Sequence, residues 1–482
     1  MLRVVVASSW ILGSLLVLLA VVTLRTEAQR IGRRAPVEDW PQFGWDVSSS
    51  GSPAGPTGIT PANATSLIRR QVPLDGTVDA SAIYLHDVTV NGSSHDVFFV
   101  TTTYGKSIAI EANTGAVLWE YTPPGYTTWV GTAQITTSTP AADPDRQHIY
   151  AAAPDGTVQK LAVADGHVMW RTSITLLPSR EKIASPSRVY EGRVIAVTGG
   201  YIGDAPPYQG HVAVLDAQTG ALQHVWNSLC SDRAGLIQPA SCQSTGSAIW
   251  GRAGAVIDAV TGNIFVATGN GPYNGKTDWG DSVIELDPYA TRVIGNYSPA
   301  NNAVLDAQDL DLGSTSPVLL GGKALAQGGK DAVIRMLSLA AITGAEPHTG
   351  NELETVSTPS HGMLFTAPAV WRGRGDSWMF VADTGGTAVW RISGYQLTQI
   401  WSNTTAGTNP VLAGGLLYVY DPNGGLHIYD PSNGHSIATL SCGRGHWNSP
   451  IVVDGKIALP EGNANEHATA GILDIWTAAV AQ

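Results

Sequence analysis

The residues best suited to chemistry lie between Ser247 and Lys330. Within this stretch the chain places one indole, one carboxamide after a glycine turn, two carboxylates and one ammonium group: Trp250, Asn270, Asp309, Asp311 and Lys330. An indole offers a flat apolar surface, and amide and carboxylate oxygens are the ligands that a hard divalent cation prefers. Such a set suits a planar polyanionic ligand.

Further candidates stand next to this set or later in the chain. Asp306 precedes the carboxylate pair, and Asp204 is the first carboxylate after the end of an earlier apolar run, Val194–Val197. His361 and Trp447, the latter in Gly-His-Trp, precede two further apolar runs. A histidine there can contact a ligand or accept a proton, but it can equally cap loop backbone.

A repeated pattern must position these residues. An apolar strand, a turn and a strand that often ends in tryptophan recur eight times, beginning near Ile108, Val158, Val212, Val283, Val333, Ala388, Leu426 and Ile472. A small polar residue, often with proline, precedes each copy, as in Ser138-Thr-Pro140 and Asn448-Ser-Pro450. Each unit supplies four strands, which is typical of a β-propeller blade. The predicted fold is an all-β, eight-bladed β-propeller of four-stranded blades.

The ends of the chain suggest how the ring closes. The last copy ends at Trp476, with too few residues left for an outer strand, and residues 66–74 can provide that strand. Pairing strands from the two termini removes the exposed edges of an open array. The expected division is therefore a targeting segment at 1–28, a linker and strap at 29–65 anchored by Trp40, Phe43 and Trp45, and the propeller at 66–482.

Composition excludes some classes of function. The formal net charge of -12 disfavours nucleic acid as a partner. The chain carries no phosphate-binding glycine loop of the nucleotide-binding kind and no Cys-x-x-Cys-His haem attachment motif. Cys230 and Cys242 lie 12 residues apart and can close a disulfide loop in an oxidising compartment, or remain two buried thiols; Cys442 has no evident partner.

The amino terminus resembles a targeting segment. Arg3 precedes an apolar run from Val4 to Leu24, and Thr-Glu-Ala28 is a candidate cleavage site. The run is also just long enough to cross a bilayer, so a membrane tether through it is the alternative. Arginines 25, 30, 33 and 34 follow the run, and the positive-inside tendency argues against export of what lies beyond them.

The repeats carry a resemblance to a known family. The pattern Ala-x-Asp-x-x-Thr-Gly-x-x-x-Trp, seen best at 110–119 and 215–226, resembles the tryptophan-docking repeat of pyrroloquinoline-quinone (PQQ) propellers. The likeness runs from about Trp40 to Trp476, and the central stretch is most similar to the polyvinyl-alcohol-dehydrogenase-like branch. It implies export to the periplasm or the cell exterior, and oxidation of a small or polymeric alcohol by hydride transfer to PQQ with Ca²⁺, electrons passing to a separate acceptor.

The resemblance also implies roles for residues. Trp250 corresponds to the indole on which the quinone stacks, Asn270 to an amide ligand of Ca²⁺, and Lys330 to a basic residue beside the quinone oxygens; His361 and Trp447 are further candidate contacts. The family's glutamate metal ligand is missing, which leaves Asp204 and Asp309 as substitutes. Its catalytic aspartate is missing too, which leaves Asp306, Asp309 and Asp311. These departures favour the alternative of a non-catalytic propeller scaffold that binds protein or polysaccharide partners.

Overall fold

The structure, a computed structural model, describes residues 39–373 and 376–478. The targeting segment expected at 1–28 and the apolar run from Val4 to Leu24 lie outside these residues. Among the helices that the described residues form, none combines the length and the apolar character needed to cross a membrane.

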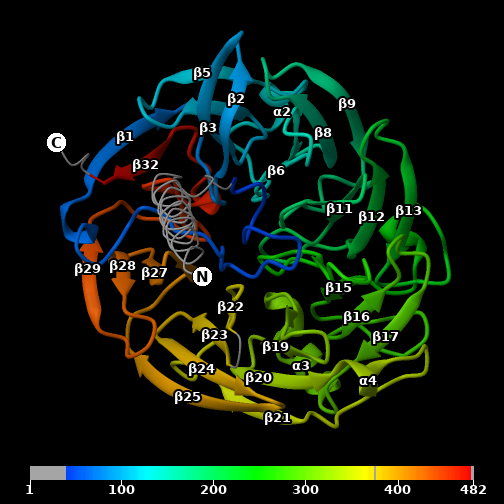
Figure 1. Ribbon diagram of the computed structural model, residues 1–482. Helices are drawn as coiled ribbons and strands as arrows, with labels where there is room; N and C mark the ends of the chain where they lie inside the picture. The colour runs from blue at the N-terminus through cyan, green and yellow to red at the C-terminus, as the bar shows by residue number, and fades with distance from the viewer. Residues whose placement is uncertain (1–38, 374–375, 479–482) are drawn as a thin grey trace, which may run out of the picture. The chain divides into compact units, whose positions relative to one another are not determined.

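Eight antiparallel sheets of four strands each form the propeller (Figure 1). The first two are β2 (Ile83–Val90), β3 (Ser93–Thr101), β4 (Ser107–Glu111) and β5 (Val117–Tyr121), then β6 (Ala141–Ala142), β7 (His148–Ala152), β8 (Thr157–Ala162) and β9 (Val168–Ser173). The third and fourth are β10 (Arg188–Tyr190), β11 (Arg193–Val197), β12 (His211–Asp216) and β13 (Leu222–Asn227), then β14 (Val256–Ile257), β15 (Ile264–Ala267), β16 (Val283–Leu286) and β17 (Val293–Tyr297). The predicted fold class is confirmed.

The remaining sheets continue in chain order. They are β18 (Val318–Leu319), β19 (Ala324–Gln327), β20 (Val333–Ser338) and β21 (Glu354–Ser357); β22 (Ala369–Arg372), β23 (Ser377–Ala382), β24 (Thr387–Ser393) and β25 (Gln396–Asn403); and β26 (Val411–Ala413), β27 (Leu416–Asp421), β28 (Gly425–Tyr429) and β29 (Ser436–Leu440). The eighth is β30 (Ile451–Val453), β31 (Lys456–Glu461), β32 (Gly471–Thr477) and, from the other end of the chain, β1 (Ile68–Leu74).

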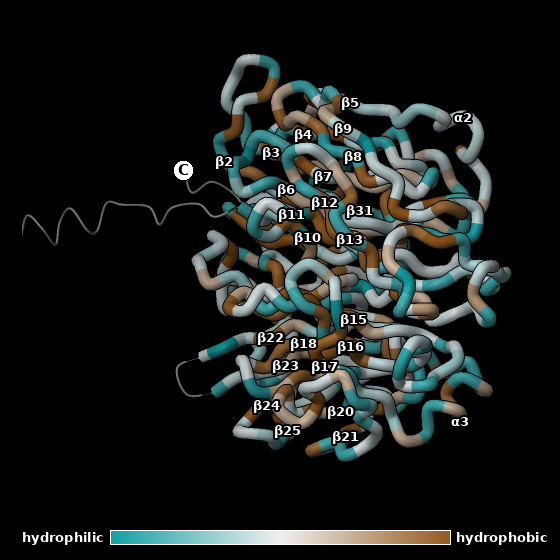
Figure 2. Tube along the Cα trace, turned by 90° about the vertical axis from the view of Figure 1, so that its right-hand side faces the viewer, coloured by the Kyte–Doolittle hydropathy of each residue, from teal (hydrophilic) through white to brown (hydrophobic). Residues whose placement is uncertain are grey.

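Helices are short and lie in the connections. They are α2 (Tyr126–Trp129), α3 (Asn302–Ala307) and α4 (Leu339–Ile342), with 3-10 turns η1 (Ala64–Ser66), η2 (Pro239–Ser241), η3 (Leu312–Ser314) and η4 (Ala464–Glu466). In the side view, α2 and α3 project from the same face of the ring (Figure 2).

The ring closes through the pairing of β1 with β32, as predicted. The pairing runs from Ile68 opposite Thr477 to Leu74 opposite Gly471. Arg69 reinforces it, because its guanidinium donates to both carboxylate oxygens of the buried Asp474, at 2.8 and 2.7 Å, and to Glu461 at 2.9 Å. A bidentate arginine–carboxylate pair fixes geometry as well as adding energy.

Tryptophans join neighbouring blades in a repeated way. The indole of Trp119 donates to the carbonyl of Val163 at 2.9 Å and covers Gly166 in the next blade. Trp170 does the same with Ala217 and Gly220, and Trp401 with Pro431 and Gly434. A Cβ on any of these glycines would come within 2.5 to 2.7 Å of the ring. The family-like repeat therefore encodes a contact between blades.

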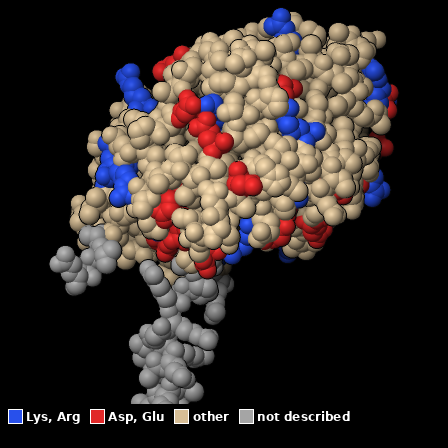
Figure 3. Space-filling model, turned by 90° about the horizontal axis from the view of Figure 1, so that it is seen from above, with Lys and Arg blue, Asp and Glu red and all other residues tan. Residues whose placement is uncertain are grey.

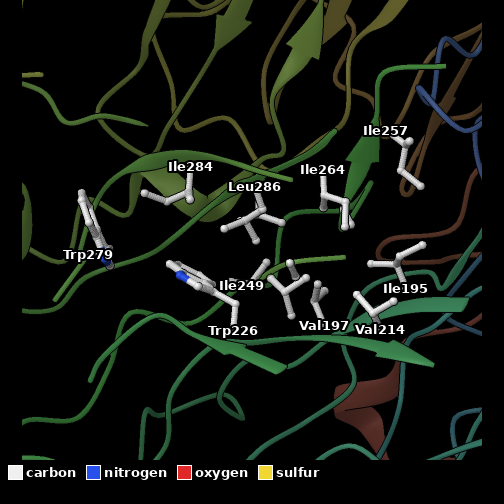
Figure 4. Close-up of a cluster of buried hydrophobic side chains, with 14 residues drawn as sticks. Ile195, Val197, Val214, Trp226, Ile249, Ile257, Ile264, Trp279, Ile284 and Leu286 are labelled. Atoms are coloured by element: carbon white, nitrogen blue, oxygen red, sulfur yellow. The ribbon is translucent and has the colours of Figure 1, made fainter. Parts of the chain in front are cut away.

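Aliphatic side chains fill the space between blades. Between the third and fourth, Ile195, Val197 and Val214 face Ile264, Ile284 and Leu286, and Figure 4 shows these side chains converging. Each contributes about 1.5–3 kcal/mol when fully buried.

Charged side chains on the face drawn in Figure 3 are few, with both signs interspersed.

Residues 40–57 form a strap that follows the inner strands around the ring. Its backbone bonds to Tyr84 in the first blade, Ile257 in the fourth and Leu412 in the seventh. Arg188, fully buried, holds the strap through the Phe43 carbonyl at 2.5 Å and the Ser49 hydroxyl. The strap bonds to the inner strands along their length and to Gly455, just after the end of β30. Trp250 and Trp447, by contrast, lie just before the start of the inner strands β14 and β30. The strap therefore lies toward the end of the channel away from these residues.

The Arg69–Asp474 pair generates a prediction about closure. Arg69→Met leaves the buried Asp474 without its cation, so we expect a loss of about 2 kcal/mol in unfolding free energy, seen as a lower thermal midpoint. Arg70→Met is the matched control, because the exposed neighbouring guanidinium donates only to the Asn113 carbonyl. Equal midpoints for the two variants would show that this pair does not hold the ring closed.

Candidate functional site

The connections that precede the inner strands bring the expected residues together. Lys330 lies at the centre of this group: its Nζ is 2.8 Å from Asp309 Oδ1, 2.5 Å from Asp311 Oδ2 and 5.6 Å from the centre of the Trp250 ring. These residues come from the connections before β14 and β18 and from the turn after β19. The indole, the ammonium group and the two carboxylates thus share one site.

Asn270 joins the same site through both its backbone and its side chain. Its backbone N–H donates to Asp311 Oδ1 at 2.7 Å, and its Nδ2 donates to Asp309 Oδ1 at 3.0 Å. The amide oxygen, Oδ1, is buried and accepts no hydrogen bond from the described residues. A buried acceptor without a donor is rare, and here it lies next to two carboxylates, as a cation ligand would.

The two carboxylates differ in environment. Asp311 is buried, both of its oxygens are engaged, and burial raises its pKa even though Lys330 opposes the shift. Asp309 is 69% exposed, and both hydrogen bonds it accepts go to Oδ1. Burial lowers the pKa of Lys330, but the two carboxylates outweigh it and raise that pKa overall. Asp309 therefore keeps a free oxygen, whereas Asp311 does not.

Asp204 lies near the same carboxylates. Its Oδ1 accepts a hydrogen bond from the Tyr208 hydroxyl at 3.1 Å. Burial raises the pKa of Tyr208, and the negative charges of Asp204, Asp311 and Asp309 raise it further. The phenol therefore stays protonated among three carboxylates, and it connects Asp204 to the site.

An aromatic row crosses the site. The Trp250 and Phe365 rings lie 6.1 Å apart, the Phe365 and Trp447 rings 5.5 Å, and the Trp447 and His446 rings 4.3 Å. These side chains come from the connections before the fourth, sixth and eighth blades. They form a row of tilted rings in which Trp250 and Trp447, both candidate contacts, stand on either side of Phe365.

A buried arginine, a half-buried lysine and a buried carboxylate complete the site, and the sequence analysis missed all three. Asp79 accepts from His446 Nδ1 at 2.8 Å and from the Trp447 backbone at 2.7 Å. Arg252 is 2% exposed, lies 5.6 Å from the Trp447 ring centre and has a buried Nε with no acceptor among the described residues. Burial lowers the pKa of Arg252 to about 10 and that of Lys182 to about 8, with Asp79 opposing both shifts.

A signal for these residues was present in the sequence. Asp79, Lys182 and Arg252 each stand next to one of the small polar motifs that precede an inner strand, in a chain with only 14% charged residues. A charge is unusual at such a buried position unless it is paired or binds something.

The other candidates stay apart from this group. Asp306 is exposed on α3, and neither its carboxylate nor the exposed His361 imidazole makes a hydrogen bond with the described residues. Their proposed roles therefore gain no contact in the structure. Cys230 and Cys242 form a disulfide that closes the loop after β13, while Cys442 is free.

Comparisons with known proteins agree with this architecture. A family model described as outer membrane protein assembly factor BamB matches residues 77–233. A polyvinylalcohol dehydrogenase from Pseudomonas sp is 25% identical over 289 residues, covering 54% of this chain and 43% of the relative. A second, from Sphingopyxis sp. (strain 113P3), is 23% identical over 206 residues, covering 40% and 30%. The chain thus matches less than half the length of these curated relatives.

Solved structures share the fold. The quinohemoprotein alcohol dehydrogenase of Comamonas testosteroni superposes with a TM-score of 0.66 at 15% identity, covering 92% of this chain and 81% of that one. A europium-containing methanol dehydrogenase superposes with a TM-score of 0.65 at 14% identity, covering 92% of this chain and 98% of that one. BamB from Moraxella catarrhalis superposes with a TM-score of 0.53 at 13% identity, covering 86% of this chain and 99% of that one. With eight four-stranded blades and tryptophans that dock neighbouring blades, the chain resembles PQQ-repeat β-propellers.

Proposed function

We propose that the protein is a quinoprotein-type oxidoreductase that binds PQQ with Ca²⁺ in this site and oxidises the hydroxyl group of an alcohol. The observation that carries the proposal is the buried, unpartnered Oδ1 of Asn270, a residue that bonds to the carboxylates of both Asp309 and Asp311. A free amide oxygen beside carboxylates is a donor set for a hard cation.

The residues present fit the quinone as well as the cation. Trp250 and Phe365 offer a flat apolar surface, and Lys330, Arg252 and Lys182 supply positive charge for a ligand that carries carboxylates. Asn270 Oδ1 would supply an oxygen for the cation, and the second carboxylate oxygen of Asp204 is a further candidate ligand. When bound, the quinone would supply the hydride acceptor that no side chain can provide.

Asp309 is the residue we assign to proton transfer. Of the three carboxylates considered, Asp311 has both oxygens engaged and Asp306 lies apart on α3, whereas Asp309 has a free Oδ2. Its Oδ1 is held by Lys330 and Asn270, which orients Oδ2 to accept the proton of a substrate hydroxyl.

The substrate and location follow the relatives that the sequence resembles. Two of them are named polyvinylalcohol dehydrogenases, so we propose a small or polymeric alcohol as substrate, with a separate protein or dye as electron acceptor. The Cys230–Cys242 disulfide supports export, because such bonds persist in oxidising compartments.

A second candidate is a scaffold without a cofactor. Lys330 already forms ion pairs with both Asp309 and Asp311, so these carboxylates have a cationic partner without a metal, and the matching family model is described as an assembly factor. Titration with PQQ and Ca²⁺, followed by a dye-linked alcohol assay, separates the two. Absence of binding at tens of micromolar cofactor would leave the scaffold.

The unpartnered amide generates a prediction about the cation. Asn270→Ala removes one oxygen ligand, so we expect Ca²⁺ to bind about 10- to 100-fold more weakly to the quinone-loaded protein, measured by calorimetry. Asn301→Ala is the control, because this exposed amide caps nothing at the start of α3. If the two variants bind Ca²⁺ equally, Asn270 is not a ligand.

The assignment of Asp309 as the base generates a prediction about the rate. Asp309→Asn preserves an acceptor for Lys330 but removes the proton acceptor, so we expect kcat to fall by about 10²- to 10⁴-fold with little change in quinone affinity. Asp306→Asn should keep wild-type kcat. The assignment fails if Asp306→Asn lowers kcat more than Asp309→Asn does.

Lys182 gives the site a pH dependence. Its pKa, lowered to about 8, means that Lys182 is charged at pH 7 and largely neutral at pH 9. We therefore expect the Kd for PQQ to rise by about tenfold over this range, as one lost charge contact of ~1.4 kcal/mol predicts. Lys182→Met should bind at pH 7 about as weakly as the wild type does at pH 9. If the Kd for PQQ depends on pH equally in both proteins, Lys182 is not the source of the pH dependence.

A further inference from the structure

Asp281 lies beneath the site without belonging to it. It ends the connection between β15 and β16, the same connection that begins with Thr268 and Asn270. Its side chain is fully buried, and its backbone lies in the left-handed region at φ 47. Figure 4 shows that the strands on either side pack into the core through Ile264 and Ile284.

Hydrogen bonds link Asp281 to both segments that carry the oxygen donors. Its Oδ1 accepts the backbone N–H of Leu312, next to Asp311, at 2.9 Å. Its own N–H donates to the Gly269 carbonyl, next to Asn270, at 2.9 Å. Because Asn270 N–H donates to Asp311 Oδ1 at 2.7 Å, the connections form a closed ring of hydrogen bonds.

Stability alone does not account for an aspartate here. The second carboxyl oxygen, Oδ2, is buried and has no partner among the described residues, and the left-handed backbone is unfavourable for a residue with a Cβ. Features that cost stability persist at sites where geometry matters for function.

We propose that Asp281 is a positioning residue that fixes the distance between the Asn270 amide oxygen and the carboxylates of Asp309 and Asp311. Asp281 binds the segment that carries Asp309 and Asp311 by accepting the Leu312 N–H. It binds the segment that carries Asn270 by donating to the Gly269 carbonyl. The role in cation binding rests on the proposed function, whereas the bracing of the two segments does not.

The experiment compares Asp281→Ala and Asp281→Asn with Arg69→Met, which lowers stability far from the site. Hydrogen–deuterium exchange of the apo protein is measured over peptides that contain Asn270 and Leu312. We expect at least tenfold faster exchange at these amides in Asp281→Ala, and near wild-type exchange in Asp281→Asn, which keeps the acceptor for Leu312. Arg69→Met should leave both peptides unchanged relative to the rest of the fourth and fifth blades.

Ca²⁺ titration of the PQQ-loaded protein is the second measurement. We expect about tenfold weaker binding in Asp281→Ala, recovery to within about twofold in Asp281→Asn, and no change in Arg69→Met. Uniform exchange across all variants, or an Asp281→Asn variant as impaired as Asp281→Ala, would overturn the positioning role. A wild type that binds neither PQQ nor Ca²⁺ would overturn the proposed function and the cation role with it, while the exchange result would still decide the bracing.

Discussion

Closure of the ring is the constraint on which the site depends. Eight sheets can point their inner connections at one axis only if the last sheet meets the first, and here β1 pairs with β32 through a strand from each terminus. The Arg69–Asp474 pair holds that seam, and the strap ties the inner strands together toward one end of the channel. Residues far apart in sequence, such as Asp79 and His446, become neighbours as a consequence.

The site concentrates charge in a protein that has little of it. Only 14% of residues are charged, yet Lys330, Arg252 and Lys182 lie together with Asp79, Asp309 and Asp311 at the inner connections. Burial makes the charges of Asp79, Arg252 and Asp311 costly unless they are paired. Most of these groups have a partner. Among the described residues, however, two buried polar atoms have none: the Arg252 Nε and the Asn270 Oδ1. The unpaired groups mark where a ligand of complementary charge would be stabilised.

The same fold serves different purposes among its relatives, which include named dehydrogenases and an assembly factor. The blades themselves carry no chemistry, because tryptophan docking and aliphatic packing are needed in any propeller of this kind. Function depends on the short connections before the inner strands. In this chain the connections at that end of the blades bring together an indole, an amide, an ammonium group and the carboxylates of Asp309 and Asp311.

The sequence by itself determined the blades, their number and the closure, because strand periodicity and the docking tryptophan are local patterns that repeat. It also determined which of the central residues, Trp250, Asn270 and Lys330, could form a site. Only the tertiary structure decided how the carboxylates divide their roles, because Asp306, Asp309 and Asp311 look alike in sequence and differ only in burial and partners. It alone revealed the surroundings of Asp79, Lys182, Arg252 and Asp281, because their neighbours come from other connections of the chain.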